Sequence, residues 1–336
     1  MTSPATLIPV TLLTGYLGSG KTTRLNAILK DSRFADAAVI VNELGDIGLD
    51  HLLVAKSEDN IVLLNSGCLC CSVLHTFKDT LADLIERRGR GDIPPFARVF
   101  IETTGLADPA PILQCLLRDS FVSHFYRLDQ VVTTVDAVLG EATLVKHAEA
   151  AKQIAVADTI IVTKTDLTGD ACPPGLAARL RALNPAAKVT LVSPGAVPDF
   201  GRAAECREVP ATDPSDHGHD HAIRAQSFII DHPVNWSGLA GWMDLVREVF
   251  GDSMLRCKGL IEIAETGKPV LVQGVQKVFS PPERLSAWPS DDHRSRLVCI
   301  THHVDPQVLT DSLAALRAEP GTFRPAALAD FAAASH

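Results

Sequence analysis

Three cysteine thiols lie within four residues of one another, at Cys68, Cys70 and Cys71. Structural disulfides fit this cluster poorly, because adjacent cysteines cannot easily bridge to each other and the other five cysteines are scattered singly. Thiolates are good ligands for soft or borderline metal ions such as Zn²⁺, and a redox centre is the other chemistry that the cluster could perform. Gly67, directly before the cluster, allows the sharp turn that the sulfur atoms need in order to converge.

A second chemical signal is the pattern Gly-x-x-x-x-Gly-Lys-Thr, which runs from Gly15 to Thr22 between an apolar run and a helical period. This pattern in this context predicts a phosphate-binding loop. Its backbone N–H groups converge on phosphate oxygens, Lys21 reaches the β- and γ-phosphates, and the Thr22 hydroxyl ligates Mg²⁺. The residues expected at the phosphates are Gly15, Gly18, Ser19, Gly20, Lys21, Thr22 and Thr23.

A carboxylate ends the apolar run Arg98–Glu102, in the segment Arg-Val-Phe-Ile-Glu-Thr-Thr-Gly105. Downstream of a phosphate loop, Glu102 is placed to hold the Mg²⁺ shell or to orient a water. The N–H of Gly105 could contact the γ-phosphate. With Lys21 and Thr22, Glu102 completes the expected catalytic set for phosphoryl transfer.

A third segment, Thr163-Lys-Thr-Asp166, ends a later apolar run and indicates which base is bound. The Asp166 carboxylate can accept hydrogen bonds from N1–H and the exocyclic amine of guanine, whereas adenine offers no such pair. The stem of Lys164 can lie across the base. Most GTPases with this pattern carry Asn where this chain has Thr163, so we expect a modest nucleotide affinity.

These residues need a sheet that brings strand ends together, and the first two thirds of the chain alternate short apolar runs with helical periods. Runs that are apolar throughout indicate strands covered on both faces, so we predict an α/β, doubly wound, mostly parallel sheet. The expected strands are Leu7–Thr14, Ala37–Asn42, Ile61–Leu64, Arg98–Glu102, Gln130–Val135, Thr159–Thr163 and Lys188–Val192, with helices at Thr76–Arg88 and Gly175–Leu183.

A polar, turn-rich segment then interrupts the apolar periodicity. It divides the chain into a phosphate-loop domain (1–209), a histidine-containing linker (210–224) and a smaller C-terminal α+β domain (225–336). Alternating imidazoles at His217, His219 and His221 could capture metal, but a solvated turn explains them equally well. The expected C-terminal elements are strands Ala225–Ile230, Leu260–Ala264, Val270–Val278 and Arg296–His302, and helices Trp236–Val249 and Pro306–Arg317.

Composition excludes several classes of partner. The formal charge is −9 without a long basic run, which disfavours nucleic acid and anionic membranes as partners. No apolar run approaches the roughly 18 residues of a membrane span. With no export signal in sight, the eight cysteines are expected to be reduced and the chain cytoplasmic.

Taken together, these motifs resemble the CobW-type GTPases, a metallochaperone family whose relatives HypB and UreG deliver nickel. The resemblance covers nearly the whole chain, and Gly-Cys-x-Cys-Cys inside a phosphate-loop domain is its most specific part. The matching segments are Gly15–Thr23, Asn42–Gly45, Gly67–Cys71, Glu102–Pro109, Thr163–Asp166, Cys257–Gly259 and Val272–Gln276.

The resemblance implies GTP hydrolysis with Mg²⁺, coupled to loading a divalent transition metal and handing it to an unidentified client metalloprotein. It also implies a C-terminal domain with an antiparallel sheet. Zn²⁺ is the default cargo, with Co²⁺ and iron left open, and a homodimer is among the assemblies left open. Cys70 and Cys71 are the firmest metal ligands, Cys68 joins them, and Glu43 or Asp46, in a segment resembling a switch loop, could complete the shell.

Two other functions remain open from the sequence. One is a zinc buffer in which the nucleotide only supports the fold, for which metal affinity would not depend on the nucleotide. The other is a phosphate-loop kinase acting on a small molecule, with the thiols as a redox switch. Asp166 argues against the kinase, because that function would go with a preference for ATP.

Overall fold

The computed structural model describes residues 7–44, 61–66, 72–193, 196–197 and 223–317, with the backbone alone for 42–44, 61–66 and 72–76. It divides into two compact units, Met1–Ala178 with Ala187–Ala203, and Arg179–Ala186 with Ala204–His336. The predicted domain limits at 209 and 224 stay a prediction, because 198–222 lies outside the described residues. None of the described helices is long and apolar enough to cross a membrane.

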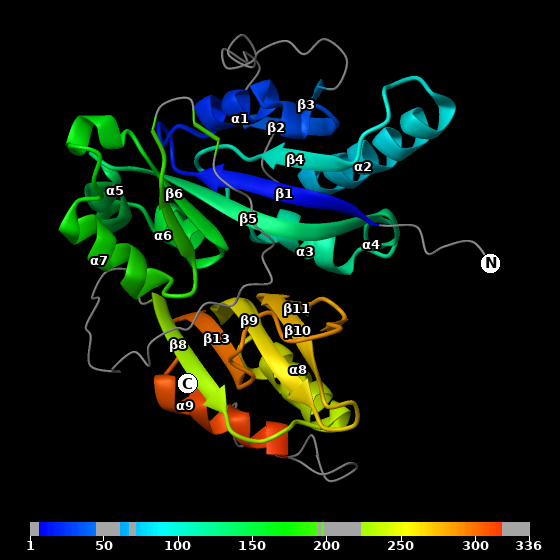
Figure 1. The fold of residues 1–336 in the computed structure, drawn as a ribbon, viewed down its shortest axis with the longest axis vertical. Helices are drawn as coiled ribbons and strands as arrows, with labels where there is room; N and C mark the ends of the chain where they lie inside the picture. The colour runs from blue at the N-terminus through cyan, green and yellow to red at the C-terminus, as the bar shows by residue number, and fades with distance from the viewer. Residues whose placement is uncertain (1–6, 45–60, 67–71, 194–195, 198–222, 318–336) are drawn as a thin grey trace. The chain divides into compact units, whose positions relative to one another are not determined.

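The first unit contains a parallel sheet of seven described strands in the order β3-β2-β4-β1-β5-β6-β7 (Figure 1). The expected doubly wound α/β fold is therefore confirmed. Its strands are β1 (Ile8–Gly15), β2 (Ala37–Leu44), β3 (Ile61–Ser66), β4 (Arg98–Glu102), β5 (Tyr126–Asp136), β6 (Thr159–Thr163) and β7 (Lys188–Leu191). Strand β5 begins four residues before the predicted start, because the alternating segment Tyr126–Asp129 also pairs with β1.

Helices connect these parallel strands, and the last of them, α7, is divided between the two units at Ala178. They are α1 (Lys21–Lys30), α2 (Ser72–Arg90), α3 (Ala110–Arg118), α4 (Val122–Phe125), α5 (Gly140–Lys146), α6 (Ala148–Ala155) and α7 (Pro174–Leu183). Leu25 and Ile28 of α1 pack into a buried cluster with Leu13, Val39 and Phe100 from the sheet. Burial of these side chains fixes α1, and with it the phosphate loop that precedes it, against the sheet.

The second unit contains an antiparallel sheet in the order β11-β10-β9-β13-β8, as the resemblance implies. Its elements are β8 (Ile223–Ile230), α8 (Trp236–Val249), β9 (Met254–Ile263), β10 (Lys268–Val275), β11 (Val278–Phe279), β12 (Glu283–Arg284), β13 (Ser295–His302) and α9 (Pro306–Ser312). Helix α8 lies against this sheet (Figure 1). Its Trp242 and Val246 side chains are fully buried in the core of the unit.

Several element boundaries in this unit differ from the prediction. The predicted strand Val270–Val278 is divided into β10, which ends at Val275, and β11, which begins at Val278, because the chain turns at Gln276 with φ 53°. Strand β8 begins at Ile223, two residues before its predicted start. Strand β9 begins at Met254, six residues before the predicted start, because Met254–Cys257 is buried and pairs with its neighbours. The predicted helix Pro306–Arg317 is α-helical only to Ser312, and Leu313–Arg317 continues as a 3-10 helix.

Candidate nucleotide site and metal motif

The ends of four strands bring the residues that are predicted to bind the nucleotide to one edge of the parallel sheet. Strand β1 lies between β4 and β5, where the strand order reverses, and ligands of such sheets bind at the carboxyl ends beside this point. Leu13 pairs with Glu102, and Asp136 pairs with Thr163. The phosphate loop, the Glu102 strand end and the Thr163–Asp166 segment therefore share an edge.

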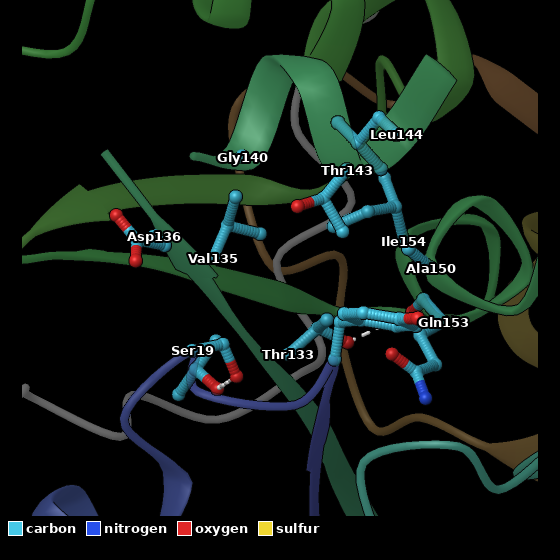
Figure 2. A pocket seen from close by; sticks show the side chains of 12 residues that line it. Ser19, Thr133, Val135, Asp136, Gly140, Thr143, Leu144, Ala150, Gln153 and Ile154 are labelled. Carbon is cyan, nitrogen blue, oxygen red and sulfur yellow. Dashed lines mark hydrogen bonds between the residues drawn. The ribbon is translucent and has the colours of Figure 1, made fainter. Parts of the chain in front are cut away.

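Glycines of the phosphate loop hold backbone conformations that other residues rarely adopt. Gly15 has φ 142° and Gly20 has φ 93°, and a Cβ at Gly15 would lie 2.5 Å from the Thr134 carbonyl oxygen. Ser19 Oγ lies 2.7 Å from Thr134 Oγ1, a hydrogen bond that ties the loop to β5 (Figure 2). Helix α1 starts at Lys21 and has no side-chain cap at Gly20, which leaves its amino end to an anion.

The Lys21 ammonium is folded onto the loop itself. Its Nζ donates to the carbonyl oxygens of Gly15 at 2.8 Å and Tyr16 at 3.2 Å, and the residue is 8% exposed. These bonds fix the cation beside the curve of the loop, where a β- or γ-phosphate would be close to it.

Thr22 and Glu102 form a pair of oxygen ligands next to this lysine. The Thr22 hydroxyl donates to Glu102 Oε1 at 2.7 Å, and Glu102 is 5% exposed. A hydroxyl and a buried carboxylate are the hard donors that Mg²⁺ prefers, and a buried carboxylate is stabilised by a cation. The residues therefore fit a Mg²⁺ site.

The loop after Glu102 runs against the phosphate loop. A Cβ added to Gly105 would lie 2.7 Å from the Leu17 nitrogen and 2.8 Å from its Cα, so the two backbones touch. Thr103 fixes the start of this loop, with its N–H bonded to the Leu13 carbonyl at 3.0 Å and its hydroxyl to Thr14 Oγ1 at 2.8 Å. The Gly105 peptide is thus held against the phosphate loop.

Thr163, the last residue of β6, supports the phosphate loop. It is 2% exposed, and its hydroxyl donates to the carbonyl oxygen of Ser19 at 2.7 Å, with Val135 O at 3.2 Å. One hydroxyl has one proton to donate, so this donor is already engaged. Thr163 therefore links the end of β6 to the phosphate loop.

Lys164 and Asp166 lie on the turn after β6. Lys164 has φ 57°, and its Nζ donates to Asp136 Oδ2 at 2.6 Å, which ties the lysine side chain to the end of β5. Asp166 is exposed in the following 3-10 turn (Thr165–Thr168), where a base can reach its carboxylate. The arrangement suits a nucleobase held between a lysine stem and a carboxylate.

Asp136 is a candidate site residue to which the sequence assigned no role. Its Oδ1 accepts from the N–H groups of Val138 at 2.7 Å and Leu139 at 3.1 Å. Burial by itself raises its pKa, but the bonds from Lys164 and these two N–H groups outweigh burial, so the net pKa lies below the usual 3.8. Its position at a strand end was visible in the sequence, but its partner lies 28 residues away.

We expect Asp136→Asn to weaken guanine nucleotide binding about tenfold and to lower the free energy of unfolding by roughly 1–3 kcal/mol at neutral pH, because Lys164 loses its charged acceptor. A lowered folded-state pKa means that this stability is complete above pH 3.8 and is lost as the pH falls through the folded pKa. Urea unfolding of both proteins should give a constant difference from pH 7 to pH 5, and a smaller one below pH 3.8. A difference that stays the same at low pH would contradict the assignment.

The predicted metal ligands lie mostly outside the described residues. This holds for Cys68, Cys70, Cys71 and Asp46 and for the three linker histidines, whereas Glu43 lies in β2 with only its backbone described. Glu43 pairs with Asn65 of β3, three residues before Cys68 in the sequence. Among the described residues, no three His, Cys, Asp or Glu side chains come together as a metal site.

Comparison with protein families covers both units of the chain. Residues 9–191 match the nucleotide-binding domain of the family described as CobW/HypB/UreG. Residues 223–317 match the family described as the cobalamin synthesis protein cobW C-terminal domain. The two matches include most of the described residues.

Individual proteins of this kind are similar along their whole length. The zinc chaperone YjiA of Escherichia coli is 34% identical over 92% of this chain and 99% of its own. The zinc chaperone CobW of Pseudomonas aeruginosa is 31% identical, over 91% of this chain and 90% of its own. The crystal structure of Zn(II)-bound YjiA GTPase from E. coli has a TM-score of 0.68 at 27% identity, and covers 93% of this chain and 100% of that chain.

Proposed function

This chain belongs to the CobW/HypB/UreG family, and on that premise we propose that it is a GTP-hydrolysing metallochaperone for zinc. One observation carries the proposal most directly: Lys21, the Thr22–Glu102 pair and the exposed Asp166 share one edge of the sheet. That set combines a phosphate cation, oxygen ligands for Mg²⁺ and a guanine acceptor. The names of the zinc chaperones YjiA and CobW support zinc as the cargo.

Hydrolysis in this proposal relies on charge stabilisation by groups that are already in position. The Lys21 ammonium and the N–H groups of the phosphate loop neutralise charge that develops on the γ-phosphate oxygens. Thr22 and Glu102 would hold Mg²⁺, and the ion would supply positive charge that neutralises the phosphates. Glu102 is the candidate for orienting the attacking water, and the Gly105 N–H contacts the γ-phosphate.

Zinc binding in this proposal uses the thiolates of Cys68, Cys70 and Cys71, with Glu43 or Asp46 completing the shell. The cluster follows β3, which pairs with β2 in the same parallel sheet as β1 and β4. If the triphosphate orders this segment, GTP assembles the metal site and hydrolysis releases the ion to a client protein. The metal and the nucleotide are then thermodynamically coupled, each raising the affinity for the other.

A zinc titration tests this coupling. We expect the Mg²⁺–GTP form, held with a non-hydrolysable analogue, to bind Zn²⁺ at least about tenfold more tightly than the Mg²⁺–GDP form, a coupling of roughly 1.4 kcal/mol. Cys70→Ser should lose zinc affinity in both forms and lose the dependence on the nucleotide. Competition with a chromogenic zinc chelator measures both effects, and parallel titrations with Co²⁺ and Ni²⁺ rank the cargo.

The matched control is Cys115→Ser in α3. Burial raises the pKa of the Cys115 thiol to about 11, so it stays protonated at neutral pH and is a poor metal ligand. Its substitution should leave zinc affinity unchanged. Equal zinc affinities in the GTP, GDP and nucleotide-free states would instead indicate a zinc buffer, and phosphorylation of a small-molecule acceptor would indicate a kinase.

A further inference from the structure

The loop from Thr103 to Pro109, which carries Gly105, is attached on its far side to helix α6. The side-chain nitrogen of Gln153 donates to the carbonyl oxygens of Gly105 at 3.2 Å and Ala107 at 3.0 Å. Next to it, Lys152 Nζ lies 3.5 Å from Asp108 Oδ2. Of these contacts, the Gln153 pair is the buried one, because Gln153 is 1% exposed whereas the Lys152 side chain is 35% exposed.

The two contacts fix the orientation of the Gln153 amide. Both acceptors are carbonyl oxygens, so the atom that faces them must be the nitrogen, since the reversed amide would oppose oxygen to oxygen. Figure 2 shows the nitrogen turned away from the other labelled side chains. The Gln153 oxygen is buried without a hydrogen-bond partner among the described residues, so the side chain acts on the loop only as a donor.

Gln153 is also rigidly mounted. The backbone carbonyl oxygen of Gln153 accepts a hydrogen bond from Thr133 Oγ1 of β5 at 2.8 Å (Figure 2). The neighbours Ala151, Ile154 and Ala155 are at most 1% exposed. The helix is therefore fixed to the sheet, and the loop is the side of this contact that can respond to a ligand.

We propose that Gln153 is a positioning residue that holds the Gly105 peptide where it can meet the γ-phosphate of GTP. The inference rests on the proposed function of the site and adds how the protein distinguishes a triphosphate from a diphosphate. Gly105 is held between Leu17 of the phosphate loop and Gln153 of α6. Loss of the donor leaves two buried carbonyl oxygens unpaired, and the loop must move to satisfy them.

A substitution series tests the proposal by the split between triphosphate and diphosphate affinity. Gln153→Met keeps the length of the side chain and removes the donor, and Gln153→Glu replaces the donor by an acceptor. Affinities for a fluorescent non-hydrolysable GTP analogue and for fluorescent GDP would be measured for each. We expect a loss of about tenfold or more for the GTP analogue, and less than about twofold for GDP, because a diphosphate does not reach the loop.

The Glu variant supplies a second readout through pH. An ionised carboxylate cannot donate to the two carbonyls, whereas a protonated carboxyl group has one O–H that can, and burial raises the pKa of such a group. The GTP-analogue affinity of Gln153→Glu should therefore recover as the pH falls from 8 to 6. Under the same conditions Gln153→Met should show no recovery beyond the wild-type profile. Glu149→Gln, exposed on the same helix, is the control and should match the wild type.

Equal losses of GTP-analogue and GDP affinity would assign Gln153 a general structural role and overturn the proposal. Wild-type preference for the triphosphate in both variants would overturn it too. The same experiments distinguish a failure of this proposal from a failure of the proposed function. A wild type that binds the GTP analogue without hydrolysing GTP, with Gln153→Met still weakening that binding, would refute the hydrolytic function and leave the role of Gln153 intact.

Discussion

Replacing Lys21 by methionine is expected to slow GTP hydrolysis by at least roughly 100-fold, the usual scale for removing one positioned donor from a transition-state charge. The ammonium lies on the phosphate loop, bonded to the Gly15 and Tyr16 carbonyls, so its charge is in place before the nucleotide arrives. Methionine has a similar length but no charge. Single-turnover hydrolysis with saturating Mg²⁺–GTP would measure the rate, and fluorescent nucleotide titration would measure the affinity.

The control for this experiment is Lys30→Met on the same helix. Lys30 lies exposed in the last turn of α1, nine residues after Lys21. The Lys30→Met protein should therefore hydrolyse GTP at the wild-type rate. Thermal unfolding of both variants separates a chemical effect from loss of the fold. A Lys21→Met protein that is folded and hydrolyses GTP within about threefold of the wild type would refute the site, because the loop would not be the phosphate-binding loop of a GTPase.

Removing the Asp166 carboxylate is expected to abolish the preference for GTP over ATP. Two hydrogen bonds from guanine to a charged acceptor contribute about 1.5–3 kcal/mol each, so their loss corresponds to roughly 10²- to 10⁴-fold in discrimination. Asp166→Ala should bind GTP more weakly, because the two hydrogen bonds to guanine are lost. Its affinity for ATP should change little, because adenine does not offer Asp166 the donor pair that guanine offers. Competition of GTP and ATP against a fluorescent GDP measures the ratio.

A sharper form of this test exchanges the hydrogen-bonding pattern. Asp166→Asn presents an amide, whose N–H₂ can donate to the C2 carbonyl oxygen that xanthine carries in place of the guanine amine. We expect this variant to prefer xanthosine triphosphate over GTP. Asp170→Asn, on the same exposed loop four residues later, is the matched control and should keep guanine specificity. A retained GTP preference in Asp166→Ala would show that the base lies elsewhere.

The sequence predicted the main features of the fold because their signals are local. Uniformly apolar runs separated by helical periods indicated the parallel sheet, and helix α8 begins and ends where its apolar period predicted. The errors lie where a local signal is weak. Polar residues within β5 and β9 shortened both predicted strands, although their pairing with neighbours extends each of them.

The sequence by itself predicted the chemistry, since Gly15–Thr22, the Cys68–Cys71 cluster and Thr163–Asp166 are short motifs that are recognised from adjacent residues alone. Only the tertiary structure decided how such groups are supported. Thr163 reaches Ser19 across 144 residues, Lys164 reaches Asp136 across 28, and Gln153 reaches Gly105 across 48. The physical reason is that these bonds require β1 between β4 and β5, and β6 beside β5, an order set by the packing of the whole sheet.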